Sequence, residues 1–253
     1  MEKQLIIIIL AGGNGTRMNS SIHSHALLEY VGGIPMVVRV INESAKLLPR
    51  KLFVIVNQNE LKIREAVRNF GITENVEFIN QGPSLGTGYA IQTCRDRLKK
   101  YNNAETLIVP GNISLITQKI MEQVVKDKGD IKVPYIEKDD AGDETRLKIV
   151  KDKFNKIIVR EECCAKDLCI KNACIGMYCI DNVLLCSNIN FITTLFTTNQ
   201  QHIEEVINII KKREHVFINL IKLPLLNHIQ VKSINTKSEL NEINNYVSAL
   251  SLI

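Results

Sequence analysis

Hydrophobic positions in the first half of the chain follow two alternating patterns. Largely apolar runs, typical of buried strands, occupy residues 5–10, 51–57, 76–81 and 105–112. Apolar residues at helical spacing, typical of amphipathic helices, occupy residues 35–48, 60–71, 86–101 and 117–128. Strands that alternate with helices in this way predict a parallel sheet covered by helices on both faces. In such sheets, ligands bind at the carboxyl ends of the strands.

The second half of the chain has a more antiparallel character. Residues 148–162 predict a hairpin that turns near residues 153–155. Further strands are predicted at residues 174–181, 217–224 and 229–234, and helices at residues 202–213 and 237–251. We therefore expect one α/β domain over residues 1–253, with a mostly parallel sheet and a more antiparallel C-terminal part.

Composition narrows the class of protein. With 45% hydrophobic and 23% charged residues, the 253-residue chain resembles ordinary globular proteins. The net charge of +5 comes from lysines and arginines that are spread along the chain, and no basic run alternates with aromatic residues. A nucleic-acid partner is therefore not expected, whereas an anionic small substrate suits the mild basic excess.

The apolar run at residues 5–11 raises the alternative of a signal peptide or membrane anchor. It is too short to span a bilayer, and glycines follow at once where the apolar core of a signal peptide would continue. We expect no membrane partner and a cytoplasmic protein.

The seven cysteines raise the alternatives of a metal site and of buried thiols. An odd number of cysteines without an export signal favours a reducing compartment. Most are clustered in the second half, at Cys163, Cys164, Cys169, Cys174, Cys179 and Cys186. Zinc ligands commonly pair at C-x2-4-C spacing, whereas these cysteines recur every five residues from Cys164 to Cys179 in an apolar segment. The spacing favours buried free thiols.

The loop after the first predicted strand, A-G-G-N-G-T-R-M at residues 11–18, carries the candidate chemistry. It lacks the third glycine of a dinucleotide fingerprint, because Met18 stands there, and no lysine follows Gly15 as a Walker loop requires. The glycines let backbone amides approach phosphates, and the Arg17 guanidinium can bind a phosphate through two donors. The alternative is tight turning alone. A second glycine-containing loop at residues 81–88 follows another predicted strand, which favours the phosphate site.

The first loop resembles the signature of the sugar-phosphate nucleotidyltransferases, or pyrophosphorylases, and in particular the uridylyltransferase domain of bacterial N-acetylglucosamine-1-phosphate uridylyltransferases. Three further segments are similar to family motifs: G-G-I-P-M-V-V-R-V-I at 32–41, Q-G-P-S-L-G-T-G-Y-A-I-Q at 81–92 and I-Q-V-K-S-I-N-T-K-S-E-L at 229–240. The resemblance spans residues 4–245 and is strong to residue 116. It implies a Rossmann-like nucleotide-diphospho-sugar transferase fold, with a nucleotide-binding half at 1–116, a sugar-binding half at 117–253 and no acetyltransferase domain.

The resemblance also implies a reaction in which a sugar 1-phosphate attacks the α-phosphorus of a nucleoside triphosphate and expels pyrophosphate. It favours UTP and N-acetylglucosamine 1-phosphate as substrates. It assigns nucleotide binding to Leu10, Ala11, Gly12, Gly13, Gly15, Thr16, Gln81, Gly86 and Thr87. Gln81, Gly86 and Thr87 would contact the uracil and the ribose. Arg17 would neutralise the charge that develops on the leaving pyrophosphate.

Two departures from the family pattern affect catalysis. Asn112 stands where the family has an aspartate that binds Mg²⁺, and Asn235 matches a second magnesium ligand. Neutral amides bind hard cations more weakly than carboxylates, so we expect a weakened magnesium site. The family's phosphate-binding lysine is also missing. An ungapped alignment places Ala26 there, and one inserted residue places His25, a candidate catalytic residue without a fixed charge at pH 7.

The sugar pocket departs further from the family. The resemblance implies a glutamate at Glu161 or Glu162, and an asparagine before Gly176. Cys174 stands at the usual asparagine position, but Asn172 would serve if the loop is longer. We take Glu161, Asn172 and Gly176 as the sugar-binding candidates.

Two further departures lie on either side of this segment. Leu147 replaces a glycine of the family pattern. His202 and Glu205 fall where the family places residues near the sugar, with a solvated helix face as the alternative.

Three interpretations of function remain. The chain is an active nucleotidyltransferase, or it is a relative that binds a nucleotide or nucleotide sugar without turnover. The third is a deliberately inactivated variant with Asn112 in place of aspartate. The oligomeric state is not predicted.

Overall fold

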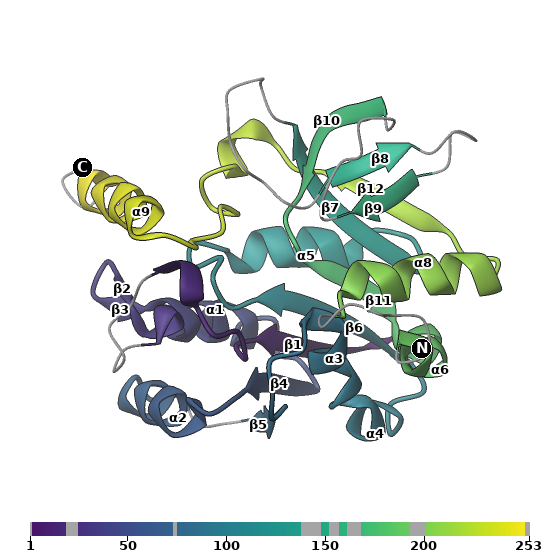
Figure 1. Ribbon diagram of the computed structural model, residues 1–253, viewed down its shortest axis with the longest axis horizontal. Coiled ribbons are helices and arrows are strands. Elements are labelled where there is room, and N and C mark those ends of the chain that lie inside the picture. The colour runs from purple at the N-terminus through teal and green to yellow at the C-terminus, as the bar shows by residue number, and fades with distance from the viewer. Residues whose placement is uncertain are drawn as a thin grey trace.

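The computed structural model describes residues 2–18, 25–72, 75–137, 148–151, 157–160, 168–192 and 201–250. Its main sheet has ten strands, in the order β5-β4-β1-β6-β11-β7-β10-β8-β9, with β12 paired to β7 (Figure 1). A small second sheet joins β2 (Tyr30–Val31) to β3 (Ile34–Pro35). The predicted α/β class is confirmed.

The N-terminal part of the sheet is parallel, as predicted. Its strands are β1 (Gln4–Leu10), β4 (Lys51–Val56), β5 (Val76–Asn80) and β6 (Ala104–Pro110). Side chains alternate across β1, so Ile6 and Ile8 enter one hydrophobic cluster while Ile7 and Ile9 enter the other. Both faces of the strand are therefore buried, which explains its unbroken apolar sequence.

The helices divide between the two clusters. One face is covered by α1 (Met36–Ala45), α2 (Glu60–Asn69) and α5 (Gln118–Lys126). The other is covered by α3 (Thr87–Gln92), α4 (Arg95–Leu98), α6 (Asn182–Asn188) and α8 (Ile203–Arg213). The closing helix, α9 (Lys237–Leu250), packs on the small sheet.

The helix predicted at 86–101 is interrupted. It forms α3 and α4, separated at Thr93 and Cys94. The Thr93 hydroxyl donates to the Ala90 carbonyl (2.6 Å), and Cys94 N–H donates to the Ile91 carbonyl (2.9 Å). These three-residue bonds tighten the turn and end the regular α-helical ladder.

The C-terminal strands are mostly antiparallel. They are β7 (Ile131–Glu137), β8 (Lys148–Lys151), β9 (Ile157–Arg160), β10 (Leu168–Cys174), β11 (Tyr178–Asp181) and β12 (Ile218–Lys222). The predicted hairpin is confirmed, because β8 pairs antiparallel with β9, although its turn lies outside the described residues.

Two strand predictions are wrong. Residues 174–181 are split between β10 and β11, because the chain turns at Gly176 with φ +74°. Residues 229–234 form turns after the 3-10 helix η4 (Leu225–Asn227). Val231 and Ile234 are buried there, so the apolar pattern is real. However, the N–H groups of Gln230 and Val231 bond locally to the Asn227 carbonyl. Burial of apolar side chains therefore arises here without a strand partner.

Shorter elements complete the described chain. The 3-10 helices are η1 (Thr16–Met18), η2 (Ala26–Leu28) and η3 (Ile189–Phe191). In the described parts of the chain, none of the helices has the length and apolar content needed to cross a membrane.

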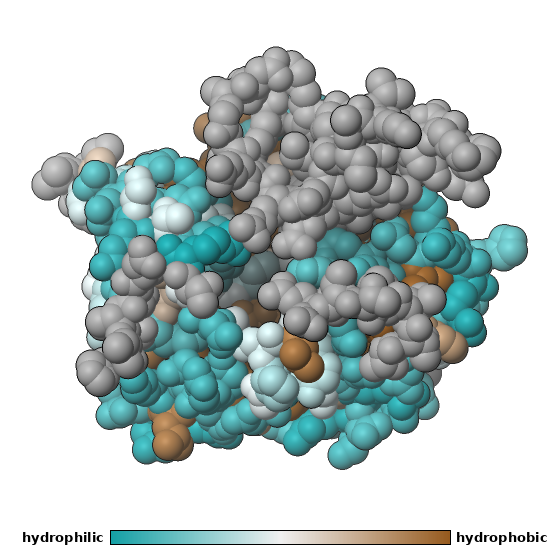
Figure 2. Space-filling view, in the orientation of Figure 1, coloured by the Kyte–Doolittle hydropathy of each residue, from teal (hydrophilic) through white to brown (hydrophobic). Residues whose placement is uncertain are grey.

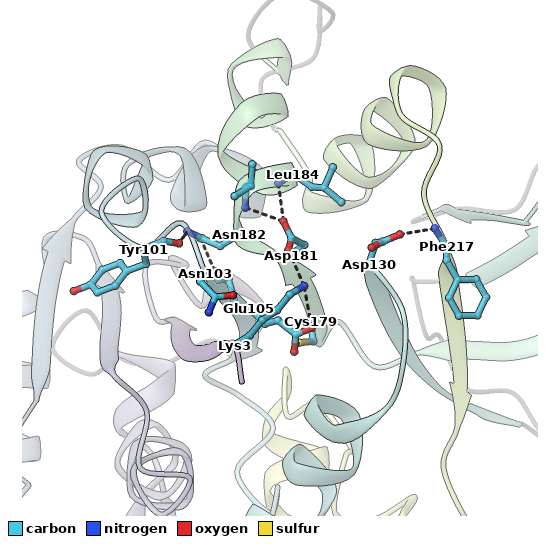
Figure 3. A network of polar contacts seen from close by, with 12 residues as sticks. Lys3, Tyr101, Asn103, Glu105, Asp130, Cys179, Asp181, Asn182, Leu184 and Phe217 are labelled. Carbon is cyan, nitrogen blue, oxygen red and sulfur yellow. Dashed lines mark hydrogen bonds and ion pairs between the residues drawn. The ribbon is translucent and has the colours of Figure 1, made fainter. Parts of the chain in front are cut away.

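Ion pairs join the strands at the edge of the sheet where the parallel strands begin (Figure 3). Lys3 pairs with Asp181 (2.8 Å) and Glu105 (3.8 Å), and the buried Lys132 pairs with Glu105 (2.8 Å). Asp130 accepts a hydrogen bond from Phe217 N–H (2.8 Å). These contacts connect β1, β6, β7, β11 and β12 at the edge opposite the glycine loop.

Candidate functional site

A cavity of about 970 Å³ lies at the carboxyl ends of β1 and β6. Figure 2 shows a hollow near the middle of the visible face, with hydrophilic residues along part of its edge. The predicted site residues that line the cavity are Leu10, Gly12, Gly13, Gly15, Arg17, His25, Gln81, Gly86, Thr87, Asn112, Gly176 and Asn235. Its size lies at the upper end of the range for ligand pockets, which suits a ligand of two joined parts.

The remaining candidates are placed differently. Ala11 is buried behind the loop and does not line the cavity. Glu161, Glu162 and Leu147 lie outside the described residues, as do the side chains of Thr16 and Asn172. The backbone of Asn172 is in β10, opposite Glu137 of β7.

Polar side chains clamp the first glycine loop at Gly12. Its carbonyl accepts hydrogen bonds from Asn57 Nδ2 (3.1 Å), Gln81 Nε2 (2.8 Å) and Ser84 Oγ (2.5 Å). A Cβ atom at Gly12 would lie 2.5 Å from Gln81 Nε2, so a larger residue would displace the Gln81 amide. Asn57 and Ser84 were not predicted, although Asn57 is the last residue of one predicted strand and Ser84 follows another within a few residues. Together they hold the loop rigid at the strand ends.

The next glycines differ in what they require. Gly15 has φ +62°, and a Cβ there would lie 2.6 Å from Ala26 Cβ. Gly13 has space around it, since a Cβ would meet no heavy atom within 4 Å. Packing within the described protein therefore explains Gly15 but not Gly13. Exposed Arg17 lines the same cavity and makes no ion pair with any described residue.

His25 is engaged within the loop. Its Nε2 lies 2.7 Å from the Gly13 carbonyl, and its Nδ1 accepts from Leu27 N–H (3.3 Å). Because Nδ1 is the acceptor, the ring proton lies on Nε2 and the imidazole is neutral. Burial lowers the pKa of His25, opposed by the bond to Gly13 and aided by the charge of Lys62. The ring thus positions the loop in this structure, and a phosphate contact by His25 stays a prediction.

Gln81 presents an oxygen without a partner. The residue is 5% exposed, and its Nε2 is fixed on the Gly12 carbonyl. Its Oε1 is buried and accepts no hydrogen bond from any described residue. Such an orphaned acceptor is costly unless a ligand or water satisfies it. Gln81 Oε1 can therefore accept a hydrogen bond from a donor group of a ligand in the cavity.

The second glycine loop supports the beginning of α8. Thr87 Oγ1 accepts from Ile203 N–H (3.0 Å), and Gly88 N–H donates to the Gln201 carbonyl (2.8 Å). A Cβ at Gly86 would collide with the Gln201 backbone, at 2.2 Å from its oxygen. This contact joins the second glycine loop to the segment that begins α8.

Asn112 and Asn235, the two predicted magnesium ligands, lie in contact although they are far apart in sequence. Asn112 Nδ2 donates to Asn235 Oδ1 (3.1 Å), and Ile234 N–H donates to the Asn112 carbonyl (3.0 Å). Glu239 also lines the cavity, and its Oε2 accepts from the N–H groups of Asn235 (2.7 Å) and Thr236 (2.9 Å).

This donor set does not fit a resident magnesium ion. The ion requires oxygen ligands, usually with carboxylates among them. Here the Asn112 amide occupies the Asn235 oxygen, and backbone amides occupy a carboxylate oxygen of Glu239. No cluster of three or more His, Cys, Asp or Glu residues suited to a metal occurs in the part of the chain that the structure describes.

A buried polar chain at the opposite end of the cavity was not predicted. Tyr178 Oη donates to Glu204 Oε1 (2.5 Å), and Cys174 Sγ donates to Tyr178 Oη (3.3 Å). Glu204, 5% exposed, and Cys174 both line the cavity. Burial raises the pKa of Tyr178 well above its usual range and that of Cys174 to about 12. In the sequence, the only signal for Glu204 was that it is adjacent to the candidate residue Glu205.

The neighbouring helix residues have separate roles. His202 lines the cavity, whereas the Glu205 carboxylate accepts from His202 N–H (3.2 Å) and caps α8. Glu205 thus stabilises the start of the helix.

The cysteines that the structure describes are buried free thiols, as the spacing predicted. Cys94, Cys174, Cys179 and Cys186 are buried and free. Burial raises the thiol pKa to about 12 for the first three and to about 11 for Cys186, so all four stay protonated at neutral pH. Cys163 and Cys164 lie outside the described residues, as does the side chain of Cys169.

Comparison with known families gives a match over more than half of the chain. A model of the MobA-like NTP transferase domain matches residues 7–148. This range contains the first glycine loop, Gln81 and Asn112. The matched region therefore contains most of the parallel half of the sheet and its loops, and extends through α5 and β7.

Curated relatives extend the similarity. The chain is 25% identical over 248 residues to the bifunctional protein GlmU of Prochlorococcus marinus (strain NATL2A), covering 96% of this chain and 53% of that protein. It thus spans about half the length of that relative. It is also 25% identical to a probable UDP-N-acetylglucosamine pyrophosphorylase of Acanthamoeba polyphaga mimivirus, covering 96% of both chains.

Solved structures share the fold. The inositol-1-phosphate CTP transferase from T. maritima superposes with a TM-score of 0.69 at 15% identity, covering 97% of this chain and 96% of that chain. The Rossmann-like transferase fold is confirmed.

Proposed function

Because the chain belongs to the family of the MobA-like NTP transferase domain, we propose that it joins a nucleoside triphosphate to a sugar 1-phosphate and releases pyrophosphate. The observation that carries the proposal is the open backbone at Gly13 beside the exposed Arg17, in one cavity with Gln81. We propose one such domain over residues 1–253, since a single sheet runs through both halves.

In the proposed reaction, a phosphate oxygen of the sugar 1-phosphate forms a bond to the α-phosphorus. The bond from that phosphorus to the bridging oxygen breaks, and pyrophosphate leaves with the electron pair. Such transfers depend on positioning and on stabilisation of charge. The loop from Gly12 to Gly15 is held rigid and supplies backbone N–H groups, and Arg17 supplies a cation for the leaving group.

UTP is the proposed nucleotide. Gln81 Oε1 is fixed and unsatisfied, and the imide N–H of uracil is a matching donor. A base without a donor at that place would leave the buried oxygen unpaired, which disfavours its binding. The solved T. maritima neighbour is titled as a CTP transferase, so CTP is the competitor to test.

N-acetylglucosamine 1-phosphate is the proposed second substrate. The mimivirus relative is named for UDP-N-acetylglucosamine, and it matches this chain over nearly its whole length. The end of the cavity formed by Gly176, Cys174 and Glu204 offers hydrogen-bond acceptors and a turn of backbone for a sugar. We propose Asn172 and Glu161 as further contacts. A cytoplasmic location suits the free thiols.

In this proposal, magnesium binds to the phosphates of the nucleotide and not to a site formed by the protein alone. It would supply positive charge on the triphosphate, while Asn112 and Asn235 hold the end of β6 against the segment before α9.

Binding without turnover is the second candidate function. It is favoured by the neutral, internally bonded His25 and by the amide at Asn112. Both positions lack the charge that would stabilise a transition state.

One assay separates the two functions. Pyrophosphate release is measured with UTP or CTP and a panel of sugar 1-phosphates under magnesium. Turnover refutes the binding-only function. Absence of turnover, together with calorimetric binding of UDP-N-acetylglucosamine, refutes the enzyme.

A further inference from the structure

Few fixed positive charges face the large cavity. Of its described lining residues, only Arg17 and Lys232 are lysine or arginine, and the imidazole of His25 is neutral and bonded within the loop. A triphosphate carries several negative charges, which a cavity of this kind has to balance. Of the described residues, Lys232 is therefore the best suited to balance the negative charge of a triphosphate together with Arg17.

The backbone around Lys232 is anchored on both sides. Val231 and Ile234 are each 2% exposed, and they pack into two different hydrophobic clusters. Ile234 N–H donates to the Asn112 carbonyl at the end of β6 (3.0 Å). The segment is thus fixed against the carboxyl edge of the sheet, three residues before Asn235.

The amine of Lys232 is paired with Glu242 of α9. Its Nζ lies 2.7 and 2.8 Å from the two carboxylate oxygens. The Lys232 side chain is 26% exposed and that of Glu242 is 55% exposed, so water screens the pair. Exposed pairs of this kind contribute little to stability. The flexible four-carbon stem allows the amine to exchange one anion for another without movement of the backbone.

We propose that Lys232 is a phosphate-binding residue and that Glu242 is its counter-ion in the absence of substrate. A polyphosphate entering the cavity takes the amine from Glu242, because it carries more charge than one exposed carboxylate. The inference rests on the proposed function, since it concerns the triphosphate of that reaction.

Substitutions of Lys232 and of Glu242 are expected to have opposite effects on ligand affinity. Calorimetry with UTP and with inorganic pyrophosphate measures the affinity. Lys232→Met keeps the stem and removes the charge, so affinity for both ligands falls about tenfold. Glu242→Gln releases the amine, so both affinities rise about threefold. Lys232→Arg keeps the charge and retains most of the affinity. Uridine, which has no phosphate, binds all variants alike.

The matched control is Lys126→Met. Lys126 forms a similar pair with Glu122 on α5 (3.1 Å) but does not line the cavity, so ligand affinity stays unchanged. The inference is refuted if Lys232→Met binds UTP and pyrophosphate as tightly as this control does, or if Glu242→Gln binds them more weakly than wild type. Either result leaves the proposed function standing. If the wild-type chain binds no nucleoside triphosphate and no pyrophosphate, the proposed function falls and the inference falls with it.

Discussion

At the edge where the parallel strands begin, the sheet carries charges in pairs, whereas at the carboxyl ends of those strands it presents glycine backbone, amides and an exposed guanidinium. Lys3 pairs there with Asp181 and Glu105 (Figure 3), and Lys132 also pairs with Glu105. Arg17 makes no ion pair among the described residues, and Gln81 Oε1 has no described partner. One end thus stabilises the fold, while the other retains binding capacity for a ligand.

The comparison predicts that charge removal has different consequences at the two ends. The largest effect is expected for Lys132→Met, because Lys132 is 2% exposed and pairs with Glu105. Leaving the Glu105 carboxylate, whose side chain is 15% exposed, poorly paired costs up to about 3 kcal/mol of unfolding free energy. Urea unfolding measures the loss.

The control at the amino end is Lys51→Met. Lys51 pairs with Glu77 at 3.2 Å on the surface, so its loss costs less than about 1 kcal/mol. Equal losses for Lys132→Met and Lys51→Met would contradict the assigned role of the buried pair.

Arg17→Ala is expected to act on binding. Loss of a charge-assisted contact weakens triphosphate binding by about 10- to 100-fold, while unfolding free energy changes by less than about 0.5 kcal/mol. Calorimetry with UTP and uridine separates phosphate from base recognition. Arg68→Ala, an exposed arginine on α2, serves as the control. Equal weakening of UTP and uridine would remove the role assigned to Arg17.

Asn112→Asp tests the neutral amide pair. The new carboxylate faces the oxygens of Asn235 and Ile234, which now accept from the Asn112 amide (3.1 and 3.4 Å). Without metal the variant is therefore less stable than wild type. Magnesium restores about 1–2 kcal/mol by binding the folded state. Thermal unfolding with and without Mg²⁺ measures this gain, and an identical response of the wild-type chain would show that the amides already bind the ion.

The smallest effect is expected from the titration of His25. Because burial lowers its folded-state pKa below the usual 6.5, the folded state favours the neutral ring. Its contribution to stability is complete above about pH 6.5 and is lost as pH falls through the folded-state pKa. Unfolding free energy should therefore drop between pH 7.5 and pH 5.

His25→Gln should flatten this pH dependence, and His215→Gln, at an exposed position, should leave it unchanged. A wild-type protein whose stability rises toward pH 5 would refute the neutral assignment of the ring. Glu60 and Glu77, whose pKa values are lowered by hydrogen bonds to arginines and other groups, titrate below this range.

Sequence patterns predicted the parallel half well, because β1, β4 and β6 are buried on both faces and the helices there on one. They failed at residues 229–234, where Val231 and Ile234 are buried from a turn. They also joined β10 to β11 across Gly176. In both places the local apolar pattern is correct, but the hydrogen-bond partner, which the pattern does not contain, decides the structure.

By itself, the sequence determined the alternation of elements, the edge at which the glycine loops gather and the absence of charge at Asn112. The tertiary structure alone decided which polar groups are already satisfied. It bonded His25 to Gly13, left Gln81 Oε1 without a described partner and placed Glu204 beside Tyr178. The reason is physical: burial follows local periodicity, whereas the state of a polar group depends on partners that folding brings from distant parts of the chain.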